Sequence, residues 1–202
     1  MMRQIGAFMA RLHTQAQQFK PPAGFVRPRW DCDRLLGQDA QTRTGWDRLT
    51  KSQWMLFEDV RERLGRAMQC IGYGSHVFGL IHGDLTFPNL LFRKGQVCAI
   101  DFDDCGFGHF LYEIATLLDH IEMREDYKSL RAALLEGYRE VRQLPREAEV
   151  HLDTFLLARW VFLGLSFLSR PEHAGPREYG PRFMKLVEPK IKKYLQPKPS
   201  RR

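Results

Sequence analysis

Residues 80–109 read LIHGDLTFPNLLFRKGQVCAIDFDDCGFGH, and this segment carries the strongest structural signal of the chain. Two short apolar runs, at 90–92 and 97–100, flank a polar stretch that contains Gly95. Apolar runs on both sides of a short turn with glycine are typical of a β-hairpin. A small β-element is therefore expected in the middle of the sequence.

The expected hairpin brings two oxygen-bearing side chains together at its open end. A turn centred near Gly95 places Asn89 opposite Asp101, or one position from it. Directly opposed residues in a hairpin have Cβ atoms about 4.5–5.5 Å apart. Amide and carboxylate oxygens are ligands that Mg²⁺ accepts, together with phosphate oxygens and water. Asn89 and Asp101 are therefore the candidate metal ligands.

Asp84 reaches the same end of the hairpin from the residues that precede it. Phosphoryl transfer requires a carboxylate that orients the acceptor hydroxyl group, and a divalent cation where charge develops on the phosphates. A turn or capping role is the structural alternative for a lone aspartate. The register of Asn89 with Asp101 favours the catalytic role, so Asp84 is the candidate base.

The motif HGDLxxxN at 82–89, followed by IDFDD at 100–104, resembles the catalytic segment of the aminoglycoside phosphotransferase and choline kinase-like family. That family shares the protein-kinase-like fold. The longer phrase IDFDDCGFGHFLYEIA resembles the RdoA-like branch, whose members are protein kinases, as much as the antibiotic-modifying branch.

The resemblance implies a role for each residue of these motifs. Asp84 would be the catalytic base, and Asn89 and Asp101 would bind Mg²⁺. His82 would support the loop through hydrogen bonds, and Asp103 would be a further acidic group. ATP would be the co-substrate, and no residue of this chain can be assigned to binding it.

Other carboxylates near the motifs leave alternatives open. One of Asp103 and Asp104 is expected to face the metal while the other caps a helix that begins near Phe110. Glu113 stands where the family pattern has an aspartate, and its greater length argues against a loop-supporting role. An acceptor pocket is expected from the helices after residue 110. Four carboxylates there either contact the acceptor or belong to a solvated helix face: Glu122, Glu125, Asp126 and Asp153.

The fold class expected from the resemblance and the apolar spacing is α+β and mainly α-helical. Residues 1–195 would form the C-terminal, large lobe of a protein-kinase-like fold, with the catalytic hairpin as its small β-element. Residues 196–202 would be a disordered basic tail. A first helix should stop before Pro21, since proline ends helices.

Further helices follow from spacing and end signals. Ser52 is expected to cap a second helix that ends at Gly72 or Gly74. Two apolar stripes after Phe110 predict two more helices. Pro145 suits the first turn of a long buried helix that runs towards residue 168, and a last helix is expected over residues 182–195.

The nucleotide-binding half of a two-lobed kinase is not found in the sequence. No glycine-rich loop after a strand and no GxxxxGK[ST] motif precedes the catalytic segment. The N-terminal nucleotide lobe is therefore expected to be absent. The isolated chain is expected to bind ATP weakly or not at all and to turn it over negligibly, because nothing would hold the phosphates from the opposite side.

Composition excludes several classes of protein. With 44% apolar and 12% aromatic residues, the chain is typical of a soluble globular protein. No apolar run approaches the roughly 18 residues of a membrane span, and the N-terminus does not read as a signal peptide. The four cysteines lack CxxC spacing. A cytoplasmic protein with reduced thiols, without a membrane partner and with Cys98 in its core, is expected.

The net charge of +7 is concentrated near the C-terminus. Residues 185–202 hold seven basic residues against one acid, Glu188. Such a charged end is expected to be frayed and solvated, and it does not form a binding face. No nucleic-acid partner is therefore expected.

Three functions compete at this stage. The first is an ATP-dependent phosphotransferase, or kinase, that phosphorylates a hydroxyl group of a small-molecule acceptor. The second is a protein Ser/Thr kinase of the RdoA-like type, with a protein acceptor. The third is a catalytically silent lobe that acts as a binding or regulatory module. The sequence indicates no oligomeric state.

Overall fold

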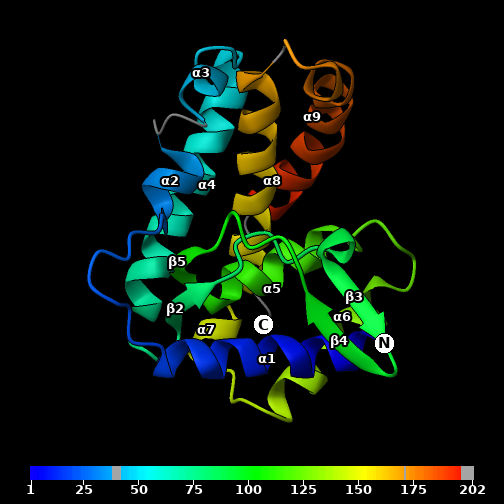
Figure 1. Ribbon diagram of the computed structural model, residues 1–202. Coiled ribbons are helices and arrows are strands. Elements are labelled where there is room, and N and C mark those ends of the chain that lie inside the picture. Colours follow the sequence, from blue (N-terminus) through cyan, green and yellow to red (C-terminus); the bar gives the residue numbers. More distant parts are fainter. Residues whose placement is uncertain (38–41, 171, 197–202) are drawn as a thin grey trace, which may run out of the picture. The chain divides into compact units, whose positions relative to one another are not determined.

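The computed structural model describes residues 1–37, 42–170 and 172–196, and the described chain is mainly helical (Figure 1). The expected α+β, mainly helical fold class is confirmed. Residues 197–202 of the expected tail lie outside the described residues. The chain divides into two compact units. Unit 1 comprises Met1–Asp31 and Ala67–Leu156, and unit 2 comprises Cys32–Arg66 and Leu157–Arg202.

Unit 1 contains the β-structure and the segment 80–109 with the HGDLxxxN and IDFDD motifs. A three-stranded sheet has the order β1-β5-β2, with β1 parallel to β5 and β5 antiparallel to β2. The strands β3 and β4 form a separate hairpin. The elements are α1 (Met2–Gln18), β1 (Arg29–Trp30), β2 (Phe78–Ile81), the 3-10 helix η1 (Phe87–Asn89), β3 (Leu90–Arg93), β4 (Gln96–Ala99), β5 (Gly106–His109), α5 (Phe110–Asp119), α6 (Tyr127–Arg139) and α7 (Arg146–Glu149).

The hairpin has the register expected from the sequence. Its turn residues, Lys94 and Gly95, have φ values of 50° and 76°. Two positive φ values in a two-residue loop match the turn that fits the twist of antiparallel strands. Beyond the strands, the N–H of Ile100 donates to the carbonyl of Asn89 at 3.0 Å. Asn89 therefore lies opposite Ile100, one position from Asp101.

The three-stranded sheet was not expected as a whole, because its central strand β5 reads as a loop. Two of its four residues are glycine, which weakens strand propensity. A Cβ at Gly106 would lie 2.4 Å from the Pro28 carbonyl oxygen, and one at Gly108 would lie 2.5 Å from Ile81. The glycines thus allow the neighbouring chain segments to approach closely.

Cys98 is exposed, so the expectation of a core position was wrong. Side chains alternate along a strand, and in β4 it is Val97 that faces inward, with 8% of its surface exposed. Among the described residues, all four cysteines are free thiols.

Helices α1 and α6 approach each other closely through two glycines. A Cβ at Gly6 would lie 2.0 Å from the carbonyl oxygen of Leu134. A Cβ at Gly137 would lie 1.9 Å from the carbonyl oxygen of Arg3. Both obstacles are backbone atoms, which cannot rotate away as a flexible side chain can. Glycine is therefore required on both helices at this crossing.

Helix α5 is the buried centre of unit 1. Its residues 110–118 are all buried, including two polar side chains, Glu113 and Thr116. The Thr116 hydroxyl donates to the carbonyl of Tyr112, four residues earlier, at 3.0 Å. Glu113 finds its partners outside the helix, in the catalytic segment.

Unit 2 is helical in its described residues. Its elements are α2 (Cys32–Leu36), α3 (Arg43–Trp46), α4 (Lys51–Ile71), α8 (Leu152–Ser169) and α9 (Ala174–Leu195), where α4 and α8 each contribute residues to both units. The cap of α4 is Thr50 and not Ser52. The Gln53 N–H donates to the Thr50 hydroxyl at 3.3 Å, and the Thr50 N–H donates to the Gln53 side chain at 3.0 Å. This reciprocal pair is a capping box.

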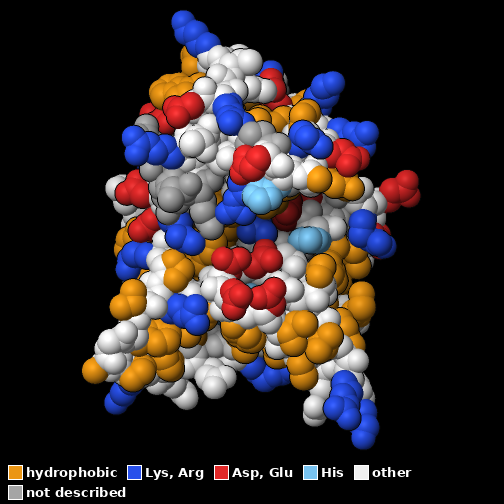
Figure 2. All heavy atoms as spheres, turned by 45° about the horizontal axis from the view of Figure 1, so that its top comes forward, with side chains coloured by type: hydrophobic (Ala, Val, Ile, Leu, Met, Phe, Trp, Pro, Cys, Tyr) orange, Lys and Arg blue, Asp and Glu red, His pale blue; other side chains and the backbone are white. Residues whose placement is uncertain are grey.

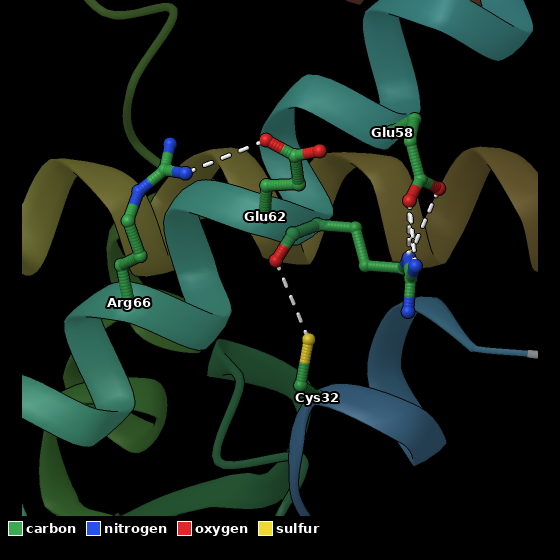
Figure 3. A network of polar contacts seen from close by, with 5 residues as sticks. Cys32, Glu58, Glu62 and Arg66 are labelled. Carbon is green, nitrogen blue, oxygen red and sulfur yellow. Dashed lines mark hydrogen bonds and ion pairs between the residues drawn. The ribbon is translucent and has the colours of Figure 1, made fainter.

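Polar contacts join α2 to α4 within unit 2 (Figure 3). The thiol of Cys32 donates to the carbonyl of Arg61 at 3.4 Å. The Arg61 guanidinium binds both carboxylate oxygens of Glu58, at 2.9 and 3.0 Å from Nε. One turn further along α4, Arg66 and Glu62 form an exposed pair at 3.4 Å. Exposed pairs contribute little to stability, whereas the thiol contact joins α2 directly to α4.

The long helix expected after Pro145 is interrupted. Pro145 caps the short helix α7, and α8 begins separately at Leu152. The sequence contains no uninterrupted apolar run long enough to span a membrane, but mean hydropathy over a whole helix is a looser test. Among the described residues, one helix, Leu152–Ser169, has the length and the mean hydropathy, 1.4, to do so. This is weak evidence for a span, because 67% of the segment is buried in the structure, as in a core helix.

The basic segment from residue 185 onward is mostly helix. Helix α9 begins at Ala174, earlier than expected, and includes Pro181. Val187 and Ile191 are buried, with 2% and 0% of their surfaces exposed. The helix expected over residues 182–195 is therefore present, and it is amphipathic up to Leu195.

We predict that Gly137→Ala destabilises the protein and that Gly65→Ala does not. At Gly137 the new methyl group meets backbone of α1, and such overpacking costs about 1–3 kcal/mol. At Gly65, in the interior of α4, the nearest atom is the Cys32 sulfur at 3.9 Å, so alanine should be neutral or stabilising. Urea unfolding of the two variants measures the difference. Equal stability of both variants would contradict the close α1–α6 crossing.

Candidate catalytic site

The turn between β2 and the hairpin requires glycine at position 83. Gly83 has a φ of 85°, a left-handed conformation that side chains disfavour. A Cβ there would lie 2.4 Å from the carbonyl oxygen of Asp104 and 2.8 Å from the Trp30 ring nitrogen. The Trp30 ring N–H donates to that same carbonyl at 2.9 Å. The chain around Asp104 and the turn are thus held together at close range.

Glu113 holds the turn through its backbone. One carboxylate oxygen accepts the N–H of His82 at 3.0 Å, and the other accepts the N–H of Gly83 at 2.9 Å. Glu113 is fully buried, with 0% of its surface exposed. Hydrogen bonds to a carboxylate are stronger than those between neutral groups. The expectation that a glutamate is too long to support this loop was therefore wrong, and Asp84 directly follows the two residues it holds.

His13 and Tyr138 lie behind Glu113. The His13 Nε2 atom is 3.5 Å from the Glu113 carboxylate, and its Nδ1 atom is 2.8 Å from the Tyr138 hydroxyl. The imidazole ring also stacks on Phe110, with 4.2 Å between ring centroids. The sequence contained a signal for this role, because His13 continues the buried helical spacing of Ile5 and Met9.

Burial and contacts set the charges of this pair. Burial lowers the pKa of His13 below its ordinary 6.5, and Glu113 offsets only part of this effect. Burial alone would raise the pKa of Glu113, but its contact with His13 and the two backbone N–H groups outweigh burial and lower that pKa. At pH 7 the site therefore holds a neutral imidazole and a buried carboxylate anion.

Asp84 and Asn89 are in direct contact. The Asn89 side-chain N–H₂ donates to the backbone carbonyl of Asp84 at 2.9 Å and to its carboxylate at 3.3 Å. The amide nitrogen of Asn89 is thus committed to Asp84, and its amide oxygen is the atom left for a cation.

Asp101 follows at the mouth of the hairpin. It is exposed and has a φ of 63°, a conformation that aspartate adopts more readily than most residues. Backbone outliers of this kind often occur at functional sites. Asp84 and Asp101 each offer a carboxylate, and Asn89 offers an amide oxygen, within one short segment. These oxygens are donors of the type that Mg²⁺ prefers. In the described part of the chain, no cluster of three or more His, Cys, Asp or Glu side chains is placed to hold a metal ion.

The two supporting residues differ in their surroundings. His82 is buried, its Nε2 atom lies 2.9 Å from the carbonyl oxygen of Ile100, and its ring contacts Phe102. It therefore links the turn to the end of the hairpin. Asp103 is exposed, and its backbone carbonyl accepts a hydrogen bond from Arg27 at 3.3 Å.

Neither Asp103 nor Asp104 caps the following helix. The N-cap of α5 is His109, without a side-chain capping bond. The His109 Nε2 atom instead lies 2.9 Å from the carbonyl oxygen of Gly72.

On the face drawn in Figure 2, several acidic side chains gather in one patch.

Two of the four carboxylates considered for acceptor binding are already in ion pairs. Asp126 binds Arg124 at 2.8 Å, and Asp153 binds Arg131. Contact with a cationic acceptor would require these pairs to open. The structure therefore does not support them as ready-made acceptor ligands.

Comparison with known proteins identifies the class to which this fold and site belong. Residues 1–150 match the profile of the phosphotransferase enzyme family that includes the aminoglycoside phosphotransferases. The chain belongs to this family. The resemblance to protein-kinase-like phosphotransferases is thereby confirmed.

The solved structures similar to this chain include a microcompartment-associated aminopropanol kinase. It has a TM-score of 0.83 and 29% identity, and the match covers 96% of this chain and 62% of that one. An amicoumacin kinase in complex with AMP-PNP, Ca²⁺ and Ami has a TM-score of 0.70 and 23% identity, over 94% of this chain and 58% of that chain. The latter likeness shows the fold alone.

Among curated proteins, an uncharacterised Synechocystis protein is 28% identical over 142 residues, which cover 69% of this chain and 38% of that protein. The amicoumacin kinase of Bacillus subtilis is 25% identical over 120 residues, or 58% of this chain and 33% of that kinase. The chain thus matches little more than a third of the length of these curated relatives.

We predict that acidification below pH 6.5 destabilises the protein partly through His13. Its folded pKa lies below the unfolded value, so the unfolded state takes up the proton first and stability falls as pH decreases through that window. His13→Gln removes the titration and should flatten the slope of Tm between pH 7 and pH 5.

The slope should not vanish, because burial also lowers the pKa of His109. His173→Gln, at an exposed histidine of unit 2, is the matched control and should leave the slope unchanged. A wild-type slope retained in His13→Gln would contradict the assignment.

Proposed function

We propose that this chain is the catalytic large lobe of an ATP-dependent phosphotransferase that phosphorylates a hydroxyl group. The observation that carries the proposal is the arrangement of Asp84 with Asn89, one hairpin position from Asp101, on a turn held by Glu113. Family membership supports it independently.

Each residue has a distinct task in the proposed reaction. The Asp84 carboxylate accepts a hydrogen bond from the acceptor hydroxyl and takes its proton as the phosphoryl group transfers. The amide oxygen of Asn89 and the carboxylate of Asp101 would hold Mg²⁺. When bound, the cation neutralises charge on the ATP phosphates. Asp103 adds negative charge beside the metal ligands, and His82 keeps the turn and the hairpin end together.

A small molecule that carries a hydroxyl group is the proposed acceptor, and an amino alcohol is its first candidate class. The likeness to an aminopropanol kinase, at 29% identity, supports this choice. A protein acceptor, as in the RdoA-like branch, and a catalytically silent binding module are the competing outcomes. We place the protein in the cytoplasm, where ATP is available and its four thiols stay reduced.

We predict that Asp84→Asn lowers phosphoryl transfer about 100-fold or more, because it removes the acceptor base. The assay measures transfer from radiolabelled ATP to amino alcohols, sugars, aminoglycosides and a generic protein substrate. Since the relatives are longer, it is run on the 202-residue chain and on the same chain joined to a nucleotide-binding lobe of a relative. Labelling of protein alone would favour the RdoA-like function. Absence of Asp84-dependent transfer in both forms would favour the silent module.

We predict that the chain binds Mn²⁺ weakly and that Asp101→Asn removes this binding. Loss of one carboxylate from a site with so few protein ligands should reduce affinity about tenfold or more. Calorimetric titration with MnCl₂ measures it. Asp59→Asn, at an exposed aspartate of α4, is the control and should bind as the wild type does. An identical response from Asp101→Asn and wild type would refute the metal site.

A further inference from the structure

We propose that Tyr138 and His13 are positioning residues for catalysis, which act through Glu113 to fix the turn that carries Asp84. The inference rests on the proposed function for its catalytic consequence. Its structural part, the control of the turn by two side chains on other helices, can be tested without any enzymatic activity.

The first step is the orientation of the imidazole. The Tyr138 hydroxyl lies 2.8 Å from His13 Nδ1. Burial raises the pKa of the Tyr138 phenol, so it keeps its proton and can donate it to Nδ1. A neutral imidazole that accepts at Nδ1 carries its own proton at Nε2. The phenol thereby fixes the tautomer in which the Nε2–H faces Glu113.

The second step is the orientation of the carboxylate. At 3.5 Å, the contact between His13 Nε2 and Glu113 is too long for a strong hydrogen bond, but it places a donor beside a buried anion. Both oxygens of Glu113 already accept backbone N–H groups of the turn. A small rotation of this side chain would therefore lengthen one of those bonds, and the imidazole limits that rotation.

The third step is the rigidity of the imidazole itself. Its ring stacks on Phe110 with an interplanar angle of 19°. The Arg142 guanidinium lies 4.7 Å from the centre of the same Phe110 ring. Two charged groups act on His13, Glu113 and Arg142, and the positive charge of Arg142 favours the neutral imidazole. Cys105, also close to Glu113, has its pKa raised by burial and stays a neutral thiol.

The chain of contacts links three helices to one turn. Tyr138 comes from α6, His13 from α1 and Glu113 from α5. The hydrogen bond between Tyr138 and His13 depends on the close α1–α6 crossing at Gly6 and Gly137. A turn of three residues is thus fixed by side chains that lie far away in the sequence.

The test uses a labelling scheme that isolates one amide. His82-Gly83 is the one His-Gly pair in the sequence. Protein labelled with ¹³C′-histidine and ¹⁵N-glycine therefore gives a single HNCO signal, from the Gly83 N–H that Glu113 binds. Its shift and its hydrogen-exchange rate report directly on the turn.

We expect Tyr138→Phe to move this signal and to speed its exchange roughly tenfold, because the carboxylate is no longer fixed. His13→Phe, which keeps a stacked ring without the polar atoms, should do the same. His13→Gln, unlike His13→Phe, keeps both a donor and an acceptor at this position and should give the wild-type signal. Tyr127→Phe removes a hydroxyl from the same helix α6, where Arg131 is its partner at 3.4 Å, and should change nothing.

Enzyme kinetics provide a second test, besides the Gly83 signal. In the phosphotransferase assay, Tyr138→Phe and His13→Phe should lower kcat about tenfold with little change in the acceptor KM, since a misplaced base affects the chemical step. His13→Gln should recover kcat.

The NMR and kinetic measurements together separate the positioning role from the proposed function. An unchanged Gly83 signal in both Tyr138→Phe and His13→Phe would overturn the positioning role, whatever the activity. An equal change in Tyr127→Phe would overturn it as well, because the effect would then not be specific. A specific change of the signal in a protein without Asp84-dependent transfer would support control of the turn and overturn the proposed function.

Discussion

The buried carboxylate of Glu113 is the group on which the arrangement of the site depends. An isolated carboxylate at this depth would be strongly unfavourable. It is stable as an anion because two backbone N–H groups and an imidazole surround it. The same contacts leave the turn of His82 and Gly83 without freedom to shift. The contacts that satisfy one buried charge are therefore the same contacts that hold the turn before Asp84, the proposed base.

The parts of the site that the sequence predicted are those governed by local rules. The hairpin register depends on strand spacing and turn length, and the sequence predicted Asn89 either opposite Asp101 or one position from it, as it is in the structure. Helices α1, α5 and α6 were predicted for the same reason, because apolar residues at helical spacing reveal a buried face. The family resemblance added roles for these residues, and the family is now established.

The parts that the sequence did not predict depend on contacts between distant segments. Glu113 was judged by its length relative to an aspartate, while its reach is set by the distance between α5 and the turn. The role of His13 depends on its contact with Tyr138 of α6. The strand β5 pairs with its neighbours because its two glycines permit a close approach. The cap of α4 was placed on Ser52, when Thr50 and Gln53 form a reciprocal pair. The first three cases join distant segments, and spacing along one segment does not encode those distances. The cap is the exception, because Thr50 and Gln53 are three residues apart and this spacing is visible in the sequence.

The contacts behind the turn come from α1, α5 and α6, and these helices are synthesised at different times during translation. The ribosome releases His13 first, then the whole of residues 82–113, and Tyr138 last. A nascent chain that has emerged as far as the hairpin already carries Asp84, Asn89 and Asp101, yet its imidazole still lacks the phenol that fixes its tautomer. The turn and the carboxylate that supports it are therefore synthesised before α6, and the contact that fixes the imidazole tautomer can form only after α6 has emerged.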